Sequence, residues 1–124
     1  MMSAGFGRVT IPTNLGEFPP VAPSAIPHRW LDKICRPLTV EEIHSIVKSF
    51  GDGAYNAMRA GFDGVEIHAV HEGYLLDQFA ISMFNQRTDE YGGSLENRLR
   101  FAREVVEEIK SRCGKDFPVA LRFS

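Results

Sequence analysis

The sequence has little cysteine, no long apolar run and no excess of positive charge. Its 124 residues include only Cys35 and Cys113, without the short spacings of metal-binding or disulfide-rich proteins. Reduced thiols, together with an N-terminus that lacks the features of a signal peptide, favour a cytoplasmic location. No apolar run approaches the ~18 residues of a membrane span. A formal net charge of −2 and the lack of a basic stripe argue against nucleic acid and membrane surfaces as partners.

Proline is scarce after the first 38 residues, where Pro118 is the only one. Residues 1–38 contain the other six prolines and several glycines, so little regular structure is expected there. The same segment carries too many apolar side chains for a free linker, and we expect it to pack against the rest of the chain.

Two amphipathic helices are predicted after this segment. Thr39 followed by Glu42 forms a capping-box pattern, and apolar residues then recur at steps of three and four over 40–60. Ser94 is suited to cap a second helix, whose apolar stripe runs to Gly114.

Two short apolar strands are predicted at 64–67 and 117–123, and the second helix joins them. This order implies a parallel crossover and an α/β fold. Successive strand side chains alternate between faces, so Glu66, His68 and Arg122 should share the face turned away from the helices. Charged groups on an inner face must be paired or must meet a ligand.

The long connection after the first strand carries most of the groups suited to chemistry. His68, His71 and Tyr74 follow the strand at the edge where α/β barrels have their active sites. A metal site formed by the histidines with Glu66 or Glu72 is conceivable, although the spacing defines no third ligand. Hydrogen-bonded structural histidines are the other alternative from the residues alone.

Several stretches of the chain closely resemble the old yellow enzyme family of FMN-dependent oxidoreductases. They are GFDGVEIH at 61–68, GYLLDQF at 73–79 and NQRTDEYGGSLENRLRF at 85–101. The stretches GFGRVTIP, PVAPSAIP and HRWLDK resemble its enoate reductase and dienoyl-CoA reductase branch. More narrowly, these stretches are similar to the sequences of the bile-acid-inducible flavoenzymes that act on 3-oxo-4-ene steroid acids or their CoA esters.

This resemblance implies a fragment of a (β/α)8 TIM barrel, roughly from the end of strand 3 through strand 5. Residues 1–124 would form part of the FMN-dependent oxidoreductase barrel, with 1–38 as its loop-rich segment and 39–124 as helix, strand, active-site loop, helix and strand. Electrons would come from or go to NAD(P)H. Any iron–sulfur cluster or FAD, as in longer relatives, would belong to parts outside this chain.

The resemblance also assigns roles to the residues after the first strand. His68 and His71 would bind the substrate carbonyl oxygen, and Tyr74 would donate a proton to the α-carbon. Tyr74 lies six residues after His68, whereas the family usually has five. Aligned backwards from Tyr74, Glu72 takes the second carbonyl-binding position and His71 is displaced.

Of the residues that the resemblance assigns to the flavin, the chain contains only some. Arg122 matches a family arginine at the pyrimidine edge of the flavin, and an ion pair with Glu66 is the alternative. The glutamine that the family places before the arginine resembling Arg8 is absent between Met1 and Arg8. The chain is therefore expected to begin within the third strand.

The predicted function is hydride transfer between FMN and an activated C=C bond of an enone, an enoate, or an enoyl-CoA or steroid-like substrate. The partner would be a small molecule. The alternative is a catalytically incompetent fragment that folds or acts only with a complementary barrel piece or by self-association.

Two structural roles are also predicted in the long connection. Leu75, Leu76, Phe79 and Ile81 should form a helical turn packed in the core, and Arg87, Asp89, Asn97 and Arg98 should tie the loop to the next helix.

Overall fold

A small parallel sheet forms the centre of the structure, a computed structural model that describes residues 1–14, 16, 18–69 and 74–122. Its strand order is β1-β4-β5, formed by Met2–Ser3, Val65–His68 and Val119–Arg122. Both pairings are parallel. The strand predicted at 64–67 is thus present one residue later, and His68 is its last residue rather than the first residue beyond it.

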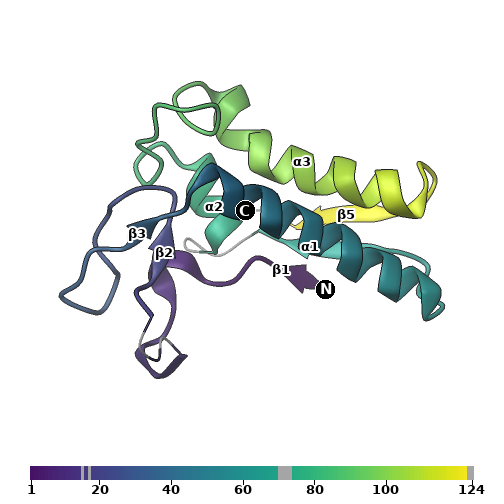
Figure 1. The fold of residues 1–124 in the computed structure, drawn as a ribbon, viewed down its shortest axis with the longest axis horizontal. Coiled ribbons are helices and arrows are strands. Elements are labelled where there is room, and N and C mark those ends of the chain that lie inside the picture. Colours follow the sequence, from purple (N-terminus) through teal and green to yellow (C-terminus); the bar gives the residue numbers. More distant parts are fainter. Residues whose placement is uncertain (15, 17, 70–73, 123–124) are drawn as a thin grey trace.

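Two long helices, α1 (Val40–Arg59) and α3 (Leu95–Cys113), lie side by side along the sheet (Figure 1). Both begin at the predicted caps. The Thr39 hydroxyl accepts from the Glu42 backbone N–H at 3.2 Å, and the Glu42 carboxylate accepts from the Thr39 N–H at 2.9 Å. Ser94 caps α3 through the Asn97 N–H. Within the described residues, no helix is both long and apolar enough to cross a bilayer.

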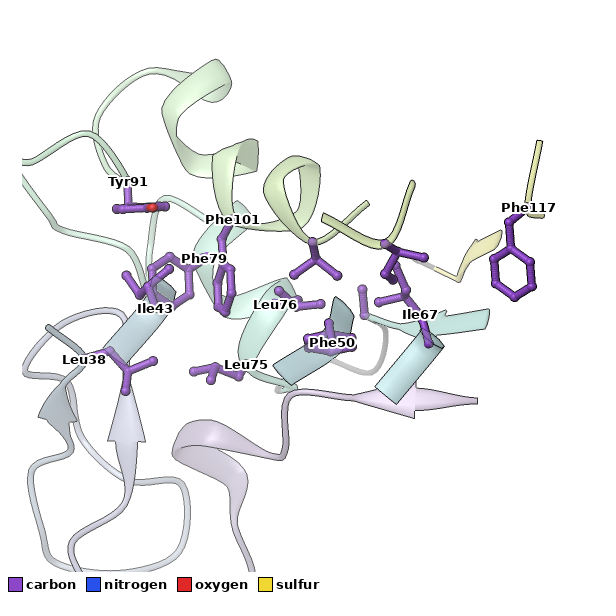
Figure 2. Packing of buried hydrophobic residues seen from close by; sticks show 14 residues of the cluster. Leu38, Ile43, Phe50, Ile67, Leu75, Leu76, Phe79, Tyr91, Phe101 and Phe117 are labelled. Carbon is purple, nitrogen blue, oxygen red and sulfur yellow. The ribbon is translucent and has the colours of Figure 1, made fainter. Parts of the chain in front are cut away.

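The hydrophobic core lies between the helices and the sheet (Figure 2). From α1, the predicted stripe residues Ile43, Phe50 and Ala54 are buried. From α3, Val105 and Ile109 of the predicted stripe are buried together with Phe101, which was not predicted, whereas Leu95 and Leu99, expected in the stripe, are exposed. Ile67 from β4 is fully buried beneath them. Val65 and Val119 pack against the same core, so this part of the predicted apolar face meets the helices, whereas Leu121 on that face is 38% exposed.

The segment before α1 has little regular structure, as predicted. It contains the short helices η1 (Gly7–Val9) and η2 (Pro12–Asn14) and two short parallel strands, β2 (Val21–Ala22) and β3 (Arg36–Pro37). A separate small cluster of Ala22, Ile26 and Cys35 packs against Phe84 from the long connection. The segment is thus fastened to the rest of the chain.

The connection between β4 and α3 contains a third helix, α2 (Leu75–Ala80). Leu75, Leu76 and Phe79 are buried in the core, which confirms the packing role predicted for them, whereas Ile81 lies just beyond the helix end. Arg98 on α3 donates to the carbonyl oxygens of Ala80 and Gly93, so it ties loop and helix as predicted.

Arg87 was predicted to tie the loop to the next helix, and this prediction was wrong. Besides Asp89, its guanidinium binds the carbonyl oxygens of Pro23 and Leu38, in the segment before α1. Gly92 packs so closely against this residue that an added Cβ would lie 2.1 Å from the Arg87 carbonyl oxygen. The loop therefore joins the N-terminal segment to the barrel core, an arrangement that local sequence patterns do not reveal.

Candidate active site

The carboxyl ends of β1, β4 and β5 lie at one edge of the sheet, and His68 is at this edge. Its side chain is 7% exposed. In the β4–β5 register, Glu66 pairs with Ala120 and His68 with Arg122. Paired residues of parallel strands project to the same face, so the predicted shared face of Glu66, His68 and Arg122 is confirmed.

Tyr74 lies directly against His68. It is the residue before the first turn of α2, and its ring centroid is 4.5 Å from that of His68, with the planes at 54°. The Phe6 ring also contacts Tyr74, with a centroid distance of 4.8 Å. His68, Tyr74 and Phe6 therefore form a continuous row of rings. His71 and Glu72 fall outside the described residues.

Backbone and side-chain bonds hold this row together across distant parts of the sequence. The Leu75 N–H donates to the Gly5 carbonyl oxygen at 3.1 Å. Gln78, fully buried on α2, accepts from the Arg8 N–H at 3.2 Å and donates to the Phe6 carbonyl oxygen at 3.0 Å. The segment after β1 is thus fixed against the start of α2, next to Tyr74.

Gln78 and Phe6 are site residues that the sequence analysis missed. Gly7 is part of the same contact, since its φ is +54° and a Cβ there would lie 2.5 Å from the Gln78 side chain. The sequence offered one signal for this contact, a glutamine between the apolar residues of LLDQF. A buried amide needs hydrogen-bond partners. Its partners lie far away in the sequence, so the pattern alone does not identify them.

Glu66 and Arg122, for which an ion pair was the alternative prediction, lie on the same face as His68. Both Glu66 and Arg122 are exposed, and among the described residues no ion pair joins them. An exposed guanidinium on the His68 face fits an anionic group, such as the pyrimidine edge of a reduced flavin. The Arg8 side chain makes contacts within the fold. Its Nε donates to the Pro27 carbonyl oxygen, and its guanidinium carbon lies 4.7 Å from the centre of the Phe84 ring.

Two candidate ligands of the alternative metal site, His71 and Glu72, lie outside the described residues. Within residues 1–14, 16, 18–69 and 74–122, no three His, Cys, Asp or Glu side chains gather as metal ligands would.

A parallel β/α arrangement with protonatable side chains at its carboxyl edge is typical of (β/α)8 enzymes. Solved structures agree with this class. Histamine dehydrogenase from Rhizobium sp. 4-9 is similar with a TM-score of 0.83 and 39% identity, covering 95% of this chain and 18% of that one. Morphinone reductase has a TM-score of 0.75 and 37% identity, over 85% of this chain and 32% of that one. The chain is therefore a segment of a TIM barrel, as predicted.

The family follows from the sequence matches. Residues 15–124 match the NADH:flavin oxidoreductase / NADH oxidase family, and the chain belongs to it. The resemblance to the old yellow enzyme family is thereby confirmed.

Two relatives match nearly the whole chain but are much longer than it. The cinnamate reductase of Clostridium sporogenes is 71% identical over 124 residues, which cover 99% of this chain and 18% of that protein. The NADH oxidase of Thermoanaerobacter brockii is 45% identical, covering 95% of this chain and 18% of its own length. The chain thus spans about a fifth of these two relatives. The 12-oxophytodienoate reductase 2 of Arabidopsis thaliana is 56% identical over 89 residues, 72% of this chain and 23% of that protein.

Proposed function

We propose that this chain forms the substrate-activating part of an FMN-dependent oxidoreductase that acts on a C=C bond conjugated to a carbonyl or carboxyl group. The observation that carries the proposal is the contact of His68 and Tyr74, with ring centroids 4.5 Å apart at the carboxyl edge of the sheet. A hydrogen-bond donor and a phenol side by side suit the two ends of one enolate.

Each residue has a defined task in this proposal. His68 donates a hydrogen bond to the substrate carbonyl oxygen and stabilises the negative charge that develops there. Tyr74 transfers its phenolic proton to the α-carbon, and its proton is replaced from solvent. His71 is proposed as a second donor to the carbonyl oxygen, as the family resemblance implies.

The residues present fit FMN at one point. Arg122 would hold the pyrimidine edge of the ring, since its guanidinium is exposed on the face it shares with His68. Bound FMN supplies or accepts the hydride at the β-carbon, with NAD(P)H as the electron donor or acceptor. Addition of one hydride and one proton reduces the alkene, and the reverse transfer forms it.

The substrate class we propose is an α,β-unsaturated carboxylate. The relative that is 71% identical over 99% of this chain is a cinnamate reductase. The steroid-like substrate suggested by the narrower resemblance remains a prediction, and a 3-oxo-4-ene steroid acid serves as the competing substrate in the tests below.

A chimera tests this proposal directly. In it, the present chain replaces the matching stretch of the C. sporogenes cinnamate reductase, and NADH-dependent reduction of cinnamate is measured. We expect an active, flavin-containing chimera in which His68→Ala and Tyr74→Phe each lower kcat about 100-fold or more. His44→Ala and Tyr55→Phe, at exposed positions of α1, are the matched controls and should leave kcat unchanged. A chimera that retains flavin but keeps its activity after both site substitutions would refute the roles.

The second candidate is a chain without activity of its own, which acts only with a complementary barrel piece. Two observations favour it. The chain covers only 18% of the length of the cinnamate reductase, and the apolar side chains of Leu99 and Leu121 are exposed. Mixing the purified chain with excess FMN, followed by desalting and a visible spectrum, tests whether the chain binds the cofactor by itself. Retained flavin absorbance supports autonomous binding, and a colourless protein supports the second candidate.

A cytoplasmic location also remains a proposal. It is supported by the two cysteines, Cys35 and Cys113, which are both free thiols in the structure.

A further inference from the structure

A cleft of about 290 Å³ opens beside Tyr74, and His68 is not among its lining residues. It is lined by Phe6, Val9, Ile11, Arg29, Trp30 and Tyr74. Three of these side chains are large and apolar yet substantially exposed, with Phe6 at 41%, Ile11 at 47% and Trp30 at 53%. A wall of this composition is typical of a site where an apolar or aromatic ligand group covers the exposed rings.

The wall of the cleft is a fixed part of the fold. His28, which is buried, accepts the backbone N–H groups of Trp30 and Leu31 on Nδ1, at 3.2 and 3.1 Å. Nδ1 is therefore the unprotonated nitrogen, and Nε2 donates to the Thr10 carbonyl oxygen at 2.8 Å. These bonds attach the Trp30 side of the cleft to the Ile11 side. The guanidinium carbon of Arg29 lies 5.7 Å from the Trp30 ring centre and adds to the same wall.

The cleft adjoins Tyr74, the proposed proton donor, and this position indicates which part of the substrate it would hold. In an enoate, the carbonyl oxygen, the α-carbon and the substituent on the β-carbon follow one another along the molecule. The rings of His68, Tyr74 and Phe6 follow one another in the same order, with neighbouring centroids 4.5 and 4.8 Å apart. An enoate that places its carboxyl group at His68 and its α-carbon at Tyr74 therefore directs its β-substituent towards Phe6.

We propose that the cleft formed by Phe6, Ile11 and Trp30 binds an aromatic ring on the β-carbon of the substrate, and so selects aryl-substituted enoates. This inference rests on the proposed function, which it makes specific. Pockets that enclose a whole drug-sized ligand measure ~300–1,000 Å³. A cleft of about 290 Å³ lies just below this range and suits a single ring better than a fused four-ring skeleton.

The main experiment measures substrate selection in the chimera. We expect Phe6→Ala and Trp30→Ala each to lower kcat/KM for cinnamate about tenfold or more, because an apolar contact of this size is removed. The value for crotonate, an enoate without a ring, should fall much less, so the ratio of the two kcat/KM values reports the contact with the ring. Trp30→Phe keeps an aromatic wall and should restore most of the preference. Phe18→Ala, at an exposed phenylalanine that does not line the cleft, is the matched control.

A second measurement does not depend on activity. Trp30 is the only tryptophan of the chain, so its fluorescence reports on the cleft directly. Titration of the 124-residue chain with 3-phenylpropionate should change the emission saturably, and Phe6→Ala should weaken the apparent affinity. Butyrate, which has no ring, should have no effect.

The outcomes separate this inference from the proposed function. A chimera that reduces neither cinnamate nor crotonate contradicts the function, whereas the fluorescence titration still tests the cleft. A chimera that reduces both, with a cinnamate preference unchanged by Phe6→Ala and Trp30→Ala, overturns the cleft assignment. The single-ring assignment is also overturned if these substitutions impair a 3-oxo-4-ene steroid acid but not cinnamate.

Discussion

Arg87 joins the connection between β4 and α3 to the segment before α1. Its side chain is 9% exposed and donates to the carbonyl oxygens of Pro23 and Leu38 and to the Asp89 carboxylate. The hydrogen bonds from Arg87 also hold the pKa of Asp89 below its ordinary value, and burial opposes them only in part. One side chain thus links three segments of the chain.

We predict that Arg87→Met destabilises the fold by about 3 kcal/mol, because buried carbonyl oxygens and a carboxylate lose their partner. Arg87→Lys keeps the charge but cannot reach all three acceptors, so it should restore only part of the stability. The free energy of unfolding from urea titration measures both. Arg103→Met is the control, since its two ion pairs are exposed and 3.6 Å long and should be worth little. Equal losses for Arg87→Met and Arg103→Met would contradict the linking role.

At the scale of the element, the start of α1 combines two local interactions. Thr39 and Glu42 form the capping box, and the Glu42 carboxylate also accepts two hydrogen bonds of 2.8 Å from Arg36, the first residue of β3. These bonds from Arg36, followed by the one from the Thr39 N–H, lower the pKa of Glu42 to about 2. The helix end is thereby attached to the loop-rich segment.

The lowered pKa predicts a pH dependence of stability at this helix end. Because the pKa of Glu42 is lower in the folded than in the unfolded chain, its contribution is complete above about pH 4.3 and is lost as pH falls towards 2. The groups are exposed, so the loss should stay under about 1 kcal/mol. Thr39→Ala should cost about 1 kcal/mol at neutral pH.

Thermal unfolding between pH 6 and pH 2.5 measures this effect. Glu42→Gln should remove part of the pH dependence in this range, and Glu107→Gln, at an exposed carboxylate on α3, should leave it in place. If Glu42→Gln and Glu107→Gln change the profile alike, the attachment of α1 through Arg36 is not the cause.

At the scale of the whole molecule, an apolar surface remains on the outer side of α2, α3 and β5. A cleft of about 300 Å³ there is lined by Ala69, Leu76, Asp77, Ala80, Leu99, Ala102 and Leu121. The sheet of three strands is also open at both edges within the described residues. In a closed barrel, further β/α units cover such surfaces.

We therefore expect the 124-residue chain to bind an apolar dye such as anilinonaphthalene sulfonate, and the chimera to bind much less. Leu99→Glu combined with Leu121→Glu should reduce the dye fluorescence of the chain by placing charges in the cleft. Phe62→Glu, at an exposed phenylalanine outside the cleft, is the control. Unchanged dye binding in the double variant would show that this surface is not the apolar site.

The sequence by itself determined the two long helices, the two strands joined through the long connection and α3, and the family. Helix caps and apolar periodicity are interactions between residues a few positions apart, so Thr39, Glu42, Ser94 and Gly114 mark the ends correctly. Alternation likewise gave the shared face of His68 and Arg122, because the side-chain period of a strand is fixed.

Only the tertiary structure decided which distant residues meet at the site. Phe6 reaches Tyr74 because Gln78 and Gly7 join the segment after β1 to α2, and Trp30 reaches the same cleft through His28. Arg87 likewise turned towards Pro23 and Leu38 instead of α3. These contacts are set by the packing of loops onto the barrel edge. No local pattern encodes them, since the partners share neither a helix face nor a strand register.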